Sequence, residues 1–116
     1  MARQFKKQTV LIELVNGTAA GEKTSPVNLD PSYTKVKGLR LHPLADGGLP
    51  YYEVGLEDNN GLLVDAENSR AYAYTAEKPW EPVDLDNKGQ QFRVKTVLPA
   101  TATGDVQYQL VFLLEK

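Results

Sequence analysis

One histidine and several carboxylate pairs are the residues of this chain whose types could support catalysis. His42 is the only histidine. As a general base it would need a nucleophile beside it, but the chain has no cysteine and no Gly-x-Ser-x-Gly motif. The paired acids are Glu57/Asp58, Asp65/Glu67 and Asp84/Asp86. A glycosidase holds two such acids across a cleft, which a chain of 116 residues seldom builds alone. We therefore predict a protein that is not an enzyme.

Residues 84–89, with the sequence DLDNKG, begin like a calcium-binding loop. The loop motif expects an oxygen ligand where Lys88 stands and a bidentate glutamate where Lys95 stands. These two lysines argue against calcium, and the acidic segment 57–61 is explained by the positive φ that a hairpin turn needs. Calcium at either loop stays an alternative. Glycine-rich phosphate-binding motifs are absent, so we expect no cofactor.

Aromatic residues in the middle third of the chain are the strongest candidates for a binding surface. They are Tyr51, Tyr52, Tyr72, Tyr74 and Trp80. If residues 71–74 form a strand, Tyr72 and Tyr74 share one of its faces, where loops could bring Tyr51 or Trp80 beside them. Such rings anchor protein interfaces or stack on sugars. We expect them in the core or at a subunit interface. The alternative is a carbohydrate platform flanked by polar groups such as Glu53, Asn68 or Arg70.

The charged residues are unevenly distributed along the chain. Residues 46–86 hold ten acidic and two basic residues, a net charge of −8, so the rest of the chain carries +6 of the overall −2. Such asymmetry is expected of a solvated surface with uneven loops, with oppositely charged contacts between molecules as the alternative. Arg3, Lys6 and Lys7 make the start of the chain basic; we expect these charges to be solvated, with an arm over residues 1–7 that contacts a neighbour or an acidic surface as the alternative. The nearly balanced total argues against direct nucleic-acid binding.

The elements that must position these residues are β-strands. Apolar side chains recur at every second position in 92–98 and 106–115, which is typical of strands with one buried face. Gly38 interrupts the alternation of a third strand and predicts a bulge. The last two strands are expected to pair across residues 99–105. The predicted strands span residues 5–15, 33–42, 51–57, 62–65, 71–74, 90–98 and 106–115, with one more extended stretch near 27–29.

Long polar connections at residues 18–31 and 77–89, and a loop at 43–50, separate these strands. Such connections let strands cross between two sheets. We therefore predict one all-β domain over residues 1–116, an antiparallel two-sheet sandwich of seven to eight strands with jelly-roll or Greek-key topology. No apolar run approaches the roughly 18 to 20 residues of a membrane-spanning helix, and no signal peptide is evident.

In its style the whole chain resembles the small β-sandwich proteins of bacteriophage particles, such as single jelly-roll capsid, penton and decoration subunits. The resemblance rests on the cysteine-free all-β pattern, the long polar loops and the terminal apolar strand VQYQLVFLLEK. It implies a structural protein of the virion that forms homo-oligomers or contacts other virion proteins. The alternative is a cytoplasmic, carbohydrate-binding sandwich module that binds a glycan.

Overall fold

The computed structural model describes residues 4–59, 61–87 and 91–116 of the chain. Its regular structure consists of β-strands and one short 3₁₀ helix. In chain order the strands are β1 (Phe5–Leu14), β2 (Gly21–Val27), β3 (Lys35–Asp46), β4 (Glu53–Asp58), β5 (Gly61–Asn68), β6 (Glu81–Asp86), β7 (Phe92–Leu98) and β8 (Val106–Glu115). The helix, η1 (Ser69–Tyr72), lies between β5 and β6. The predicted all-β class is confirmed.

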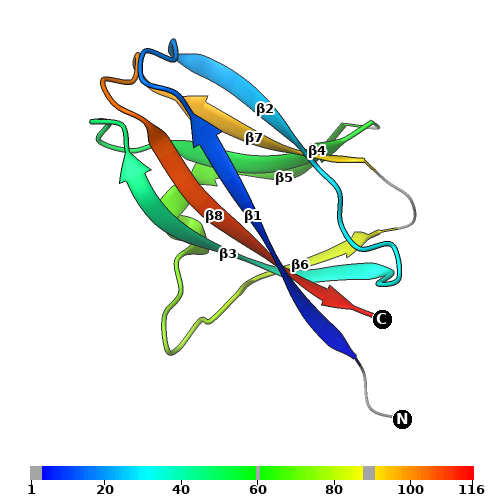
Figure 1. The fold of residues 1–116 in the computed structure, drawn as a ribbon. Helices are drawn as coiled ribbons and strands as arrows, with labels where there is room; N and C mark the ends of the chain where they lie inside the picture. Colours follow the sequence, from blue (N-terminus) through cyan, green and yellow to red (C-terminus); the bar gives the residue numbers. More distant parts are fainter. Residues whose placement is uncertain (1–3, 60, 88–90) are drawn as a thin grey trace.

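The strands form two antiparallel sheets that pack face to face (Figure 1). The first sheet has the order β1-β8-β3-β6, and the second has the order β2-β7-β4-β5. The pairs β1–β8, β2–β7, β3–β6 and β4–β5 are those of one long hairpin folded back on itself. This is the jelly-roll arrangement of eight strands. The predicted sandwich and its topology are therefore confirmed.

The hydrophobic core lies between the sheets and follows the two-residue period of β7 and β8. Alternate side chains of both strands are almost completely buried, among them Phe92, Val94, Tyr108 and Phe112. Thr96 also points inward, and its hydroxyl forms a 2.6 Å hydrogen bond with the Tyr108 hydroxyl. Because each buried hydroxyl serves the other, the core accommodates two polar groups without leaving either unpaired.

Three expectations about the strands are wrong. Both long connections contain a strand, β2 in one and β6 in the other. The sequence did not indicate these strands because each is an edge strand with a proline and a partly solvated face, so its apolar residues do not alternate clearly. The strands β7 and β8 do not pair with each other; they lie in opposite sheets. Residues 71–74 are not a strand, because residues 69–72 form η1, which Asn68 caps by accepting a hydrogen bond from the Arg70 amide.

Strand β3 has the predicted bulge, but it ends later in the chain than predicted. The predicted bulge is confirmed, since its register with β6 and β8 shifts between Val36 and Gly38. The strand does not end at His42 but continues to Asp46 through Pro43. Pro43 lies beyond the part of β3 that pairs with β6 and beside a register shift with β8 between Pro43 and Ala45, the kind of irregular position at which a strand tolerates proline. Within the described residues, the structure contains no helix that is long and apolar enough to cross a membrane.

Candidate functional site

The structure does not bring the five candidate aromatic residues together. Tyr52 and Tyr72 belong to the core, with 3% and 1% of their surfaces exposed. The ring of Tyr52 stacks on that of Tyr108 at 5.3 Å between centroids, and the Tyr72 hydroxyl donates a 2.7 Å hydrogen bond to the Val54 carbonyl. Burial raises the pKa of both tyrosines. Neither ring is therefore available as an exposed platform for a ligand.

Trp80 and Tyr74 lie with Arg40 on the outer face of the β3 sheet. Leu39 and Leu41 point into the core, so Arg40 between them points outward. Its guanidinium carbon lies 4.2 Å from the centroid of the Trp80 ring and 5.4 Å from that of Tyr74. Guanidinium groups over aromatic faces attract electrostatically. The Trp80 side chain also covers Gly38, where an added Cβ would lie 3.1 Å from the Trp80 Cβ.

The cluster of Arg40, Tyr74 and Trp80 packs segments of the chain together and leaves little free surface for a ligand. Trp80 is half-buried, whereas Tyr74 is 55% exposed. The Arg40 Nε is buried without a hydrogen-bond partner, and the aromatic rings around it offer electrostatic attraction in place of an acceptor. Trp80 thus fixes the segment that leads into β6 against the bulge of β3. Tyr74 is the one member of the cluster with a substantially free ring.

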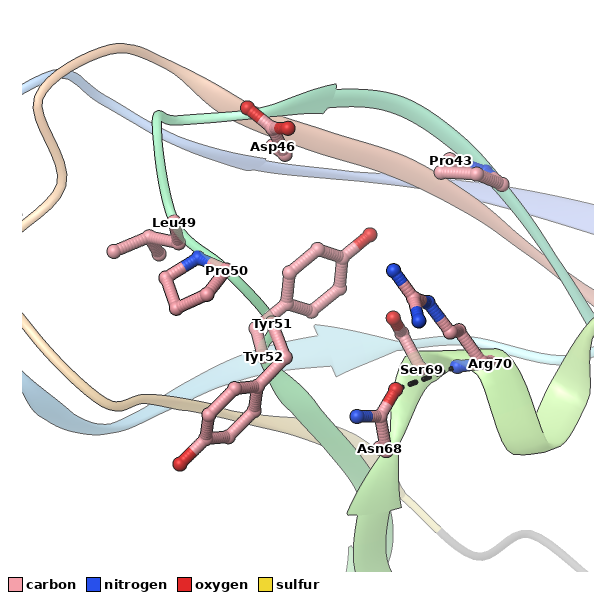
Figure 2. Close-up of a pocket in the computed structure, with 9 residues that line it drawn as sticks. All are labelled: Pro43, Asp46, Leu49, Pro50, Tyr51, Tyr52, Asn68, Ser69 and Arg70. Atoms are coloured by element: carbon pink, nitrogen blue, oxygen red, sulfur yellow. Dashed lines mark hydrogen bonds between the residues drawn. The ribbon is translucent and has the colours of Figure 1, made fainter.

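Tyr51 lines a pocket at one end of the sandwich (Figure 2). The pocket encloses about 210 Å³, and its wall combines the end of β3, the segment before β4 and the start of η1. Figure 2 shows Pro43 and Asp46 on one side and Asn68, Ser69 and Arg70 facing them. The complete lining is Pro43, Asp46, Leu49, Pro50, Tyr51, Tyr52, Asn68, Ser69 and Arg70.

Some polar groups of this pocket already form hydrogen bonds within the protein. An Asp46 carboxylate oxygen accepts a 2.9 Å hydrogen bond from the Gly48 amide, and the Asn68 side-chain oxygen accepts one from the Arg70 amide. The Tyr52 hydroxyl is buried and lacks a hydrogen-bond partner. Asp46, the Asn68 amide nitrogen and the Arg70 guanidinium remain able to bind a small hydroxylated molecule. The carbohydrate alternative put Asn68 and Arg70 beside Tyr72, Tyr74 or Trp80, whereas the structure places them in the lining with Tyr51. Asp46 was not selected, because the sequence predicts a loop there.

The basic residues near the start of the chain lie largely on β1. Lys6 and Lys7 belong to this strand, and Arg3 lies outside the described residues. The Lys6 ammonium bonds to the Asp30 carboxylate at 2.8 Å, which raises the pKa of Lys6 and lowers that of Asp30. Lys6 also lies 5.8 Å from the Tyr33 ring centroid. It therefore holds the segment after β2 against β1, and residues 5–7 are part of the sheet.

The outward side of β1 carries exposed apolar residues that the sequence analysis did not select. Val10, Ile12 and Leu14 pack in or against the core, so the odd-numbered side chains point outward. Phe5 and Leu11 are 53% and 50% exposed. Val15 continues the alternation just beyond the strand and is 71% exposed. Polar Lys7, Thr9 and Glu13 interrupt this outward row, so the sequence alone gives no clear apolar pattern on that side of the strand.

The outer face of the other sheet carries ion pairs between neighbouring strands. Lys95 of β7 pairs with Glu22 of β2 at 2.9 Å, and Arg93 pairs with Glu57 of β4 at 3.2 Å. Partly exposed pairs of this type contribute roughly 0 to 1 kcal/mol each, so they keep the surface charged more than they stabilise the fold. The first sheet also carries such pairs, between lysines of β3 and aspartates of β6.

The residues considered for catalysis and metal binding are dispersed. His42 lies half-buried on β3 opposite Gln109 of β8. Asp84 and Asp86 lie on β6, where Lys37 and Lys35 bind their carboxylates at 3.0 and 2.6 Å; Lys88 and Gly89 of the same motif lie outside the described residues. Within residues 4–59, 61–87 and 91–116, no three His, Asp or Glu side chains are placed to hold a metal ion.

Comparison with known proteins adds no relative. No protein-family model matches the chain, and no curated protein matches its sequence.

Proposed function

We propose that this protein is a non-enzymatic structural subunit that self-associates or docks on a larger symmetric assembly. The observation that supports this function is the outward row of β1, where Phe5, Leu11 and Val15 expose about half or more of their surfaces. These residues lie along a sheet edge, and exposed apolar side chains gathered on one element mark sites of protein contact. Their burial against a neighbour would remove exposed apolar surface of this edge from water.

We infer that this assembly is a virion, in which the protein would serve as a capsid, penton or decoration subunit of a bacteriophage. The jelly roll is a common fold of viral capsid subunits, although lectins and cupins share it. The charge segregation along the chain supports contacts between unlike surfaces of neighbouring subunits. The expected partners are further copies of this chain and other virion proteins, and the expected location is the virion.

The first test is the solution mass, measured by size-exclusion chromatography with light scattering over a range of protein concentration and salt. A closed oligomer supports self-association, and binding to a preformed particle supports docking. The paired substitution Phe5→Ser and Leu11→Ser should abolish either behaviour while circular dichroism stays unchanged. Leu62→Ser, at an exposed site on β5, is the matched control. A protein that is monomeric throughout and binds no particle would contradict the proposal.

A carbohydrate-binding module is the second candidate, and the Tyr51 pocket is the observation that favours it. An exposed aromatic ring beside a carboxylate, an amide and a guanidinium is a suitable arrangement for a sugar ring and its hydroxyls. The volume of about 210 Å³ lies below the roughly 300 Å³ typical of small-molecule sites, so a single sugar residue is the largest ligand expected inside.

A screen of monosaccharides by NMR chemical-shift perturbation tests the second candidate. Binding that is lost in Arg70→Ala and Tyr51→Ala but kept in Tyr74→Ala would support it, because Tyr74 is an exposed aromatic residue outside the pocket lining. Shifts that cluster around Tyr74, or the absence of shifts for any sugar at millimolar concentration, would contradict a sugar site in this pocket.

A further inference from the structure

Strand β1 is an edge strand with one free backbone side. Within the described part of the chain it pairs only with β8, through ten residue pairs without a register shift. The other three edges are less suited to pairing. Strands β2 and β6 each contain a proline, and the pairing of β5 with β4 shifts register twice. Strand β1 is thus the long, regular edge that can accept another strand.

We propose that β1 pairs antiparallel with β1 of a second copy of the chain, with Val10 of each copy opposite Val10 of the other. This deepens the proposed function, on which it rests, by naming one contact surface of the assembly and its occupant. Two sheets of four strands would join into one continuous sheet across a two-fold axis. The backbone groups on the free side of β1 would then form ladder hydrogen bonds instead of contacting water.

The outward side chains select this register. In a two-fold antiparallel pair, opposite residues occupy the same face, so an outward residue must oppose an outward residue. With Val10 on the axis, Lys7 opposes Glu13 twice, and Phe5 opposes Val15 twice, while Thr9 opposes Leu11. Among the outward residues, opposite charges therefore meet at Lys7 and Glu13 and apolar side chains meet at Phe5 and Val15, with Thr9 and Leu11 between them.

Neighbouring registers lose this complementarity. Moving the axis to Thr9 places Phe5 opposite Glu13 and Lys7 opposite Leu11; moving it to Leu11 places Lys7 opposite Val15. Among the described residues, Lys7 and Glu13 have no ion-pair partner within their own chain, so both are available to a second copy. A pattern that complements itself in reverse direction indicates a second copy of the same strand as the occupant.

Charge reversal tests the pairing with a built-in rescue. Lys7→Glu alone, or Glu13→Lys alone, opposes like charges at two positions and should weaken association about 10- to 30-fold. The double variant Lys7→Glu/Glu13→Lys restores unlike pairs and should associate like the wild type, yet it should not form mixed oligomers with it. These exposed side chains are not part of the core, so the fold should persist in all three variants.

A single-cysteine variant tests the register directly. The chain has no cysteine, so oxidised Val10→Cys should form a disulfide-linked dimer, because residues opposite each other across antiparallel strands lie within the usual Cα separation of a disulfide. Thr24→Cys, at an exposed position on the β2 edge, should stay monomeric under the same oxidation.

The outcomes separate this inference from the proposed function. An oligomer or particle-bound protein that ignores the charge variants and leaves Val10→Cys uncrosslinked would overturn β1 pairing while the structural function stands. Both would be overturned if the wild-type protein is monomeric at every concentration and binds no particle, and if the Val10→Cys variant forms no crosslink.

Discussion

The Tyr72 side chain crosses from η1 into the core to reach the backbone of β4. Its hydroxyl donates to the Val54 carbonyl, and the ring is almost fully buried. Tyr72→Phe keeps the ring but removes the donor, so we expect it to lower the free energy of unfolding by about 1 to 2 kcal/mol. Urea denaturation measures this as a lower midpoint at constant slope. Tyr74→Phe, at an exposed ring, should change stability by less than about 0.5 kcal/mol. Equal effects of the two changes would contradict the assignment.

Gly38 and Trp80 form a second pair whose contact is tested by substitution. An added Cβ at Gly38 would lie 3.1 Å from the Trp80 Cβ and 3.3 Å from two ring atoms, closer than comfortable packing. We expect Gly38→Ala to destabilise the protein by about 1 to 3 kcal/mol through overpacking. In a Trp80→Gly background the same change should cost far less, because both the Trp80 Cβ and the ring that it would contact are gone. A double-mutant cycle by urea denaturation measures the difference, and additive effects would show that the contact is not the cause.

At the scale of elements, the hairpin of β4 and β5 depends on the absence of a side chain at Gly55. A Cβ there would lie 2.8 Å from the Val64 carbonyl oxygen and 2.9 Å from the Ala66 amide nitrogen, both backbone atoms of β5. Because backbone cannot swing aside as a side chain does, Gly55→Ala should displace β5 and cost about 1 to 3 kcal/mol.

Hydrogen exchange measured by NMR tests this expectation element by element. In Gly55→Ala, amides of β5 should exchange faster, while amides of β1 and β8 in the opposite sheet keep their protection. Gly104→Ala is the matched control, because a Cβ at Gly104 meets its nearest atoms at 3.6 Å or more. Uniform loss of protection in both sheets would instead indicate a general loss of stability.

The sequence predicted the central strands and the edge strands β1 and β5, but not the edge strands β2 and β6, for a physical reason. Strands β7 and β8 bury every second side chain between two sheets, and this burial produces a clear alternation. Strands β2 and β6 have neighbours on one side only, so polar residues and a proline are tolerated in each, as in GEKTSPV. Local pattern also carries no information on which strands pair, so β7 and β8 were assigned to one hairpin although they lie in different sheets.

The candidate site was predictable only in part. Residue types pointed to the tyrosines near positions 51 and 72, but burial separates Tyr51 in the pocket from Tyr72 in the core. Asp46 joins the pocket because β3 continues through Pro43, which a loop prediction excluded. The exposure of Phe5 and Leu11 on β1 could be recognised only from the order of strands in the sheet. In a strand covered on both faces, the same side chains would be buried. The types of side chain that could bind a ligand were therefore known from the sequence, whereas their solvent exposure could be known only from the fold.

At the scale of the whole molecule, both sheets carry ion pairs between neighbouring strands. Exposed apolar side chains distinguish the β1 edge, where Phe5 and Leu11 expose about half of their surfaces. An assembly of this molecule would have a natural polarity, with charged surface towards solvent and the β1 edge towards a neighbour.

Burial of tyrosine hydroxyls couples the stability of the whole molecule to alkaline pH. The pKa values of Tyr52, Tyr72 and Tyr108 are raised above the ordinary value of about 10, chiefly because burial disfavours the phenolate. Above pH 10 the unfolded chain releases these protons while the folded chain retains them. The unfolded state then binds fewer protons, so stability is full below about pH 10 and falls as the pH rises further.

Each tyrosine that stays neutral in the fold contributes a loss of about 1.4 kcal/mol per pH unit above its unfolded pKa. Urea denaturation followed by Trp80 fluorescence between pH 8 and 11.5 should show a plateau and then a steep decline. Tyr72→Phe should have a shallower decline, because one group no longer titrates on unfolding. If absorbance at 295 nm shows all six tyrosines ionising together near pH 10 while fluorescence reports a folded core, the burial of these hydroxyls would not control the transition.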